Sequence, residues 1–191
     1  MDAHLNREII YRIDETNCIT YLSPGWFNFA AKNGAADLKA DQIIGRPLLS
    51  FISGNSTRQL FSLILDHVRR SHWSLEFPFR CDSPTLRRFM EITITPLDQF
   101  HLEFRCCTIK EELRSRAPLF EKEEPPTEPL LRMCSWCKKV AIPSGKWVEV
   151  EEAVRELHLF EHQPFPQVTH GICMNCELQV RAKLKTSSPK H

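Results

Sequence analysis

Four cysteines stand in two pairs of identical spacing, and they carry the clearest chemistry in the sequence. Cys134 and Cys137 form the first pair, Cys173 and Cys176 form the second, and 35 residues separate the pairs. Two residues between cysteines let both sulfur atoms of a tight turn face one point, so two such turns supply the four thiolates that tetrahedral zinc prefers. The spacing therefore predicts a structural zinc site filled entirely by protein, with no position open for catalysis.

The residues next to these cysteines bear on which ion is bound. Four thiolates also suit iron, but Lys138 and Glu177 stand where rubredoxin-like iron sites usually have glycine. His170 could replace one thiolate as a ligand, although we favour a hydrogen bond from its ring to a metal-bound sulfur. Lys138 and Lys139 either offset the negative charge of the thiolates or are solvated surface residues.

The expected cellular context keeps the cysteines reduced. The first ten residues lack the apolar core of a signal peptide. The densest apolar stretch, Leu60–Leu65, is far shorter than the roughly 20 residues that span a membrane. We therefore expect a cytoplasmic protein with reduced thiols. Cys18, Cys81, Cys106 and Cys107 share no spacing and are expected to be core or partly exposed thiols.

Length and composition leave room for one ordinary domain and one small one. The chain has 191 residues, of which 42% are hydrophobic and 26% charged, and its net charge is +1. No overall field favours nucleic acid or a membrane surface, although residues 132–191 are mildly basic, with nine Lys and Arg against six Asp and Glu. No phosphate-binding glycine loop, catalytic triad order or paired-carboxylate motif stands out. We expect no enzymatic activity.

The elements that precede the cysteines predict an α+β domain over residues 6–109. Strands are expected at 9–13, 19–22, 73–80, 90–95 and 102–107, from their alternation of apolar and polar residues. Helices are expected from Ser23-Pro24 to about Asn33, at 40–44, and at 57–70 with Asn55 or Ser56 as the cap. The period-two alternation of the last three strands predicts a sheet with one buried side and one polar side.

The rest of the chain divides into three segments. Residues 110–131 read as an acidic, proline-rich linker that begins with a short helix over 110–116. A four-cysteine metal module, called the cysteine module, covers residues 132–181, and residues 182–191 are expected to be disordered. Trp136 and Trp147 are expected to form the core of this module.

Two groups of charged residues are expected to be solvated. The acidic residues Glu149, Glu151 and Glu152 begin an exposed helix, and a divalent-cation site there is the less favoured interpretation. The arginines of the first domain are expected on solvated faces rather than in a phosphate-binding or acidic-partner patch. They are Arg69, Arg70, Arg80, Arg87 and Arg88.

The first domain resembles a PAS domain. The resemblance lies in the element order, in Ile19-Thr20-Tyr21-Leu22-Ser23-Pro24 before the first helix, and in the Gly45-Arg46 turn of Ile43-Ile44-Gly45-Arg46-Pro47-Leu48. It implies an α+β fold with a five-stranded antiparallel sheet and helices on one face. It also implies either a ligand cavity between sheet and helices or a module for dimerisation and partner docking. The side chains that would line or fill such a cavity are Trp26, Phe27, Phe29, Leu60, Ile64, Phe77, Met90 and Ile92.

No cofactor can be assigned to this domain from the PAS resemblance. The segment Asn55-Ser56-Thr57-Arg58-Gln59-Leu60 lacks the cysteine of flavin photosensors and the histidine of haem sensors. The PAS ligand is therefore unknown.

The cysteine module resembles a short tail found on bacterial PAS and response-regulator proteins. The matching residues are Met133-Cys134-Ser135-Trp136-Cys137-Lys138-Lys139, the later Trp147, and His170-Gly171-Ile172-Cys173-Met174-Asn175-Cys176. This second resemblance implies signal transduction and no settled chemistry for the tail.

Together these features predict a non-enzymatic bacterial signalling protein. Its PAS-like domain would sense a ligand or dock a protein partner, with a homodimer as one arrangement, and a structural zinc module would be coupled to it. One alternative is a DNA-binding regulator that uses Arg181, Lys183 and Lys185. The other is a redox sensor in which oxidation of thiols releases the metal.

Overall fold

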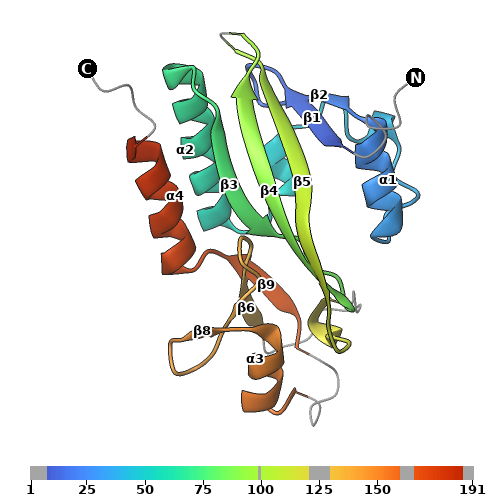
Figure 1. Cartoon of the computed structure of the whole chain (residues 1–191), viewed down its shortest axis with the longest axis vertical. Coiled ribbons are helices and arrows are strands. Elements are labelled where there is room, and N and C mark those ends of the chain that lie inside the picture. The colour runs from blue at the N-terminus through green and yellow to red at the C-terminus, as the bar shows by residue number, and fades with distance from the viewer. Residues whose placement is uncertain (1–7, 99, 121–129, 160–165, 187–191) are drawn as a thin grey trace.

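The computed structural model describes residues 8–98, 100–120, 130–159 and 166–186. Its largest element is a five-stranded sheet in the order β2-β1-β5-β4-β3, in which every neighbouring pair is antiparallel (Figure 1). The strands are β1 (Ile9–Ile13), β2 (Ile19–Leu22), β3 (Leu75–Arg80), β4 (Leu86–Pro96) and β5 (Leu102–Leu113). The α+β class and the five-stranded sheet are confirmed.

The chain between β2 and β3 forms the helical layer. Its elements are α1 (Pro24–Lys32), the 3-10 turns η1 (Ala40–Gln42) and η2 (Leu48–Phe51), and α2 (Asn55–Ser71). As predicted, the Ser23 hydroxyl caps α1 by accepting a hydrogen bond from the Trp26 N–H at 3.2 Å. The predicted cap of α2 is wrong, because Gly54 precedes the helix and both Asn55 and Ser56 lie inside its first turn.

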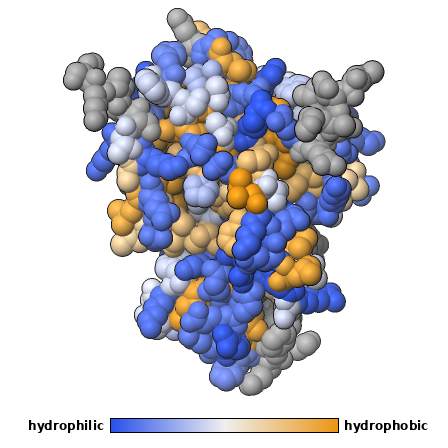
Figure 2. Space-filling view, viewed as in Figure 1, coloured by the Kyte–Doolittle hydropathy of each residue, from blue (hydrophilic) through white to orange (hydrophobic). Residues whose placement is uncertain are grey.

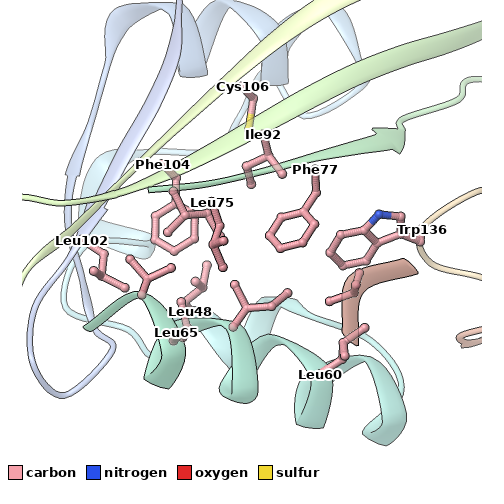
Figure 3. Close-up of a cluster of buried hydrophobic side chains, with 14 of the residues drawn as sticks. Leu48, Leu60, Leu65, Leu75, Phe77, Ile92, Leu102, Phe104, Cys106 and Trp136 are labelled. Carbon is pink, nitrogen blue, oxygen red and sulfur yellow. The ribbon is translucent and has the colours of Figure 1, made fainter. Parts of the chain in front are cut away.

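The core of the domain lies between the sheet and one face of α2 (Figure 3). Leu60, Ile64, Leu65 and Val68 recur at helical spacing on α2 and are buried, as the periodicity of the segment predicts. The sheet meets them with alternate side chains of its strands, among them Leu75, Phe77, Ile92, Leu102 and Phe104. Period-two alternation places these residues on one face of the sheet, and this face is the one that the helices cover.

The cysteine module has a small sheet of its own, in the order β8-β7-β6-β9. Its elements are β6 (Leu131–Cys134), β7 (Val140–Ala141), β8 (Trp147–Val148), α3 (Val150–Glu156), β9 (Val168–Gly171) and α4 (Met174–Thr186). The expectation that α3 is exposed is wrong. Val150, Ala153 and Val154 are buried in a second core with Met133 and Val140, because the acidic residues occupy only the opposite side of the helix.

The structure moves two predicted boundaries. The helix predicted over residues 110–116 is wrong, because residues 110–113 continue β5 and pair with residues 86–89 of β4. Beyond them a 3-10 turn, η3, covers Pro118–Phe120, and residues 121–129 of the predicted linker lie outside the described residues. At the other end, α4 continues to Thr186, so residues 182–186 are helical, and the remaining predicted tail lies outside the described residues.

Trp136 joins the cysteine module to the PAS-like domain. Its indole N–H donates to the Pro78 carbonyl at 2.7 Å, and its ring lies 5.5 Å from that of Phe61 and 5.8 Å from that of Phe77 (Figure 3). Trp136 is buried, and Trp147 packs against the same hydrophobic cluster, as predicted for core residues of the module. This cluster is not confined to the module, because it continues through Trp136 into the PAS-like domain.

Other contacts extend this junction. The Arg80 backbone N–H donates to the Trp136 carbonyl at 2.8 Å, and Thr57 Oγ1 lies 3.1 Å from Ser135 Oγ. Helix α4 runs beside α2, and its Lys183 ammonium donates to the Glu76 carbonyl and lies over the Phe77 ring (Figure 1). The two parts therefore share one packed interface.

Gly54 allows the closest backbone approach in this interface. Its φ is +86°, and a Cβ at this position would lie 2.4 Å from the carbonyl oxygen of His170 in β9. A side chain would therefore force the start of α2 away from the cysteine module.

We expect Gly54→Ala to lower the free energy of unfolding by about 3 kcal/mol, because left-handed backbone strain adds to overpacking. Gly34→Ala is the matched control, since Gly34 has φ +78° and no atom within 4 Å of its added Cβ. Its cost should be about 1–2 kcal/mol. Urea unfolding of both variants measures the difference. Equal losses would contradict a tight contact at Gly54.

Candidate metal centre and adjoining cavity

The four predicted cysteines converge on one point between β6, β9 and α4. Cys134 ends β6, Cys137 is the last residue of the turn after it, Cys173 precedes α4, and Cys176 lies in the first turn of α4. All four sulfur atoms lie within 4.8 Å of one another. The Cys137 and Cys173 sulfurs are 3.8 Å apart, and a tetrahedron with zinc–sulfur bonds of about 2.3 Å has edges of about 3.8 Å. The cluster has the dimensions of a four-thiolate metal site.

Crowding of the sulfurs makes a cation the natural partner of this cluster. Hydrogen bonds from the thiols of Cys137 and Cys176 lower the pKa of Cys134. The hydrogen bond with Cys134 raises the pKa of Cys137 to about 12, and the hydrogen bonds with Cys134 and Cys137 raise the pKa of Cys176. Without a metal, one thiolate therefore forms at the expense of its neighbours, whereas a divalent cation would stabilise all four. The Cys173 backbone N–H also donates to the Cys134 sulfur at 3.4 Å.

His170 and the two lysines take different positions around the cluster. His170 lies on β9 and is not among the side chains that group with the four sulfurs. Burial, and then the charge of Lys138, lower the pKa of His170. Lys138 has a positive φ of 62° and donates from Nζ to the Ser135 carbonyl at 2.9 Å, and burial lowers its pKa. Lys138 therefore faces inward, whereas sequence alone left open whether it is solvated.

A cavity of about 540 Å³ lies between the sheet, α1, the start of α2 and the cysteine module. Of the predicted lining residues, Trp26, Phe29, Met90 and Ile92 line it. Three others, Leu60, Ile64 and Phe77, are packed into the solid core instead, and Phe27 packs against that core. The sequence did not predict the wall from the cysteine module, which consists of Ser135, Trp136, Lys138 and His170. Residues far apart in sequence form this wall only after the two parts dock.

Two arginines that were expected on solvated faces are instead buried. Arg80 is 7% exposed and Arg88 is 6% exposed. Asp82, whose side chain is fully buried, pairs with Arg80 and also with Arg114 at 3.0 Å. The guanidinium groups need these carboxylates because an unpaired buried charge is costly.

The acidic start of the α3 segment completes the same network. Glu149 pairs with Arg80 at 2.7 Å, and Glu151 pairs with Arg114 at 2.7 Å and with Arg87 at 3.0 Å. The guanidinium groups of these arginines thus lie where a divalent cation would have to bind the two glutamates. No spacing rule connects a strand residue to a glutamate 69 positions later, so sequence reasoning could not find these pairs.

The remaining cysteines lie where the sequence places them. Cys106 is buried and its neighbour Cys107 is exposed, on opposite faces of β5. Burial raises the pKa of Cys106 to about 12. Cys18 and Cys81 are half-buried. Cys81 and Cys106 also line the cavity.

The strand order and the helical layer define the N-terminal part of this protein as PAS-like, with a four-cysteine cluster docked against it. No protein-family model matches the chain, and no curated protein sequence matches it. No helix of the described residues has the length and apolar character needed to cross a membrane.

Solved structures similar to this one include three PAS-type sensor domains. The PAS domain of the quorum-sensing receptor RpfR from Cronobacter turicensis, in complex with BDSF, is 13% identical with a TM-score of 0.41 and aligns over 55% of this chain and 95% of its own. The photoactive yellow protein domain of the sensor histidine kinase Ppr from Rhodospirillum centenum is 12% identical with a TM-score of 0.41 over the same shares. The PAS domain of nitrogen regulation protein NR(II) from Vibrio parahaemolyticus is 16% identical with a TM-score of 0.36, over 56% and 95%.

Proposed function

We propose that this protein is a cytoplasmic, non-enzymatic signal-transduction protein. Its PAS-like domain would sense a small molecule or dock a protein partner, alone or as a homodimer. Cys134, Cys137, Cys173 and Cys176 would hold a structural zinc ion, which supplies a cross-link between β6 and α4. Four protein ligands leave no open position on the metal, which argues against metal catalysis.

The observation that carries this proposal is the continuity of the core. One hydrophobic cluster contains Ile64 and Phe77 of the PAS-like domain together with Cys134, Trp136 and Cys173 of the cysteine module. Packed interiors respond to change by switching between discrete arrangements rather than by yielding gradually. A change of ligand in the cavity or of metal at the cluster would therefore alter the module and domain together, and a partner could read that change.

The polar character of the surface supports a role in binding partners from aqueous solution. Hydrophilic residues cover most of the visible face, and hydrophobic residues occur there in separate patches (Figure 2). The basic helix α4 is partly engaged within the protein. Arg181 pairs with Glu177 at 2.9 Å, and Lys183 contacts Glu76 and Phe77. These contacts favour a packing role for α4 over DNA binding.

Elemental analysis and the absorption spectrum of the purified chain test this proposal, together with thermal unfolding in the presence of a strong chelator. We expect one zinc ion per chain, no visible chromophore, and a single unfolding transition that the chelator moves to lower temperature. A metal-free chain with the same melting temperature would overturn the zinc assignment. Iron absorption would instead favour a redox sensor, and two separate transitions would contradict the coupling of the two parts.

A further inference from the structure

The cavity between the two parts combines an aromatic wall with a cluster of polar groups. Aromatic rings from several elements face it, including Trp26, Phe29, Phe61 and Trp136. Aliphatic and sulfur-containing side chains complete this apolar wall, among them Ile9, Ile52, Met90 and Ile92. Its volume of about 540 Å³ lies in the range of small-molecule sites, roughly 300–1,000 Å³. An apolar body of moderate size would fit this wall.

The polar groups gather on the side that the cysteine module supplies. Ser135 lies between the first two cysteines and Lys138 directly follows the second, and Lys138 Nζ donates to the Ser135 carbonyl at 2.9 Å. Thr57 Oγ1 lies 3.1 Å from Ser135 Oγ. His170 and Arg80 also line the cavity, and Tyr11, Asn33 and Ser53 add polar groups from the PAS-like domain. A ligand with one polar end would therefore be oriented by this turn.

The ionisable side chains on this side of the cavity are basic. The cavity lining contains Lys138, Arg80 and His170, and it contains no aspartate or glutamate. Arg80 is already neutralised by Asp82 and Glu149. Lys138 forms no ion pair with any carboxylate among the described residues, although its side chain turns inward. A lysine in this environment is a site for an anion brought from outside.

We propose that the cavity binds an organic acid with an apolar body, whose anionic group lies at Lys138 and Ser135 and whose body packs among the aromatic rings. This inference rests on the proposed sensing role and names the class of molecule sensed. Because Ser135 and Lys138 lie within and just after the Cys134–Cys137 turn, the acid and the metal would hold the same segment in place. Binding of either one would then stabilise the site of the other.

A pair of fluorescent probes that differ in one charge tests this proposal on the full chain. 8-Anilinonaphthalene-1-sulfonate carries an anionic group, and N-phenyl-1-naphthylamine has the same ring system without it. We expect Lys138→Met to weaken binding of the sulfonate at least tenfold, which is the effect of one lost charge-assisted hydrogen bond. Binding of the uncharged probe should change less than twofold. Lys139→Met, next along the same turn but outside the cavity lining, should change neither affinity.

A third variant locates the bound probe. Ala30 lines the cavity from α1 and is not part of the cysteine module. Ala30→Trp should fill the cavity and weaken both probes at least tenfold with the zinc content unchanged. Retained binding in Ala30→Trp, or equal effects of Lys138→Met on both probes, would overturn the proposal. Equal losses of sulfonate binding in Lys138→Met and Lys139→Met would also overturn it, because they would indicate a diffuse surface charge.

Zinc content measured on each sample separates this inference from the proposed function. A wild-type chain with one zinc ion but no charge-dependent probe binding would remove the organic acid and leave the zinc-coupled regulator standing. A wild-type chain without zinc that still discriminates the probes through Lys138 would keep the cavity ligand and remove the metal.

Discussion

Replacing Cys173 by serine should release the zinc and lower the melting temperature of the whole chain, including the PAS-like domain. Cys173 is 4% exposed and lies in the same hydrophobic cluster as Phe77 and Ile64. Zinc bound to a cluster that forms only on folding contributes its binding free energy to stability. We expect a loss of about 5 kcal/mol or more, because zinc-finger sites of this type are worth about 10–16 kcal/mol in isolated peptides. Metal analysis and calorimetry of the same sample measure both effects.

Cys107→Ser is the matched control for this experiment. Cys107 is exposed on β5 and lies outside the four-cysteine cluster. Its replacement should leave one zinc ion per chain and change stability by less than about 0.5 kcal/mol, as is usual for surface substitutions. The zinc assignment fails if Cys173→Ser retains a full equivalent of zinc. If only the cysteine module loses its structure, the hydrophobic core that it shares with the PAS-like domain does not couple the stability of the two parts.

Asp82→Asn should produce the second large effect. The Asp82 side chain is fully buried and pairs with two arginines whose side chains are 8% and 2% exposed, Arg80 and Arg114. Asparagine keeps the size of the side chain but removes the charge that both guanidinium groups share. Removing one partner of a buried ion pair usually costs about 3–5 kcal/mol. Chemical denaturation should show a loss of this size.

Glu112→Gln provides the comparison for Asp82→Asn at a site with more solvent. Glu112 is 33% exposed and pairs with Arg87 at 3.4 Å and with Lys110 at 2.6 Å. Exposed pairs contribute about 0–1 kcal/mol, so this variant should remain close to wild type. Similar losses in the two variants would show that burial of the Asp82 network does not govern its contribution.

Much of the PAS-like domain could be predicted from local patterns. The alternation in residues 75–79 identifies a strand with one buried face, and the spacing of Leu60, Ile64 and Val68 identifies a helix with one apolar stripe. Ser23-Pro24 marks the start of α1 through its capping chemistry. These signals depend only on neighbours a few residues apart. They failed at residues 110–113, where pairing with β4 extends a strand through a charged segment.

The candidate site likewise contains some residues that local spacing predicts and others that it does not. The convergence of Cys134, Cys137, Cys173 and Cys176 could be anticipated because two residues of spacing set the geometry of each turn. The positions of Trp136 and Lys138 could not be anticipated in this way. A tryptophan fits the core of a small module as well as it fits the side of a larger domain, and a lysine after a metal turn is compatible with either surface or cavity.

The sequence by itself determined most strands and helices of the PAS-like domain and the two cysteine turns, because each depends on periodicity or spacing within a short stretch of chain. Only the tertiary structure decided that the cysteine module docks on the PAS-like domain and closes a cavity with Ser135, Lys138 and His170. It alone decided that Arg80 meets Glu149 across 69 residues. The physical reason is that docking depends on the shape and charge of two assembled surfaces, and neither surface exists until its own elements have folded.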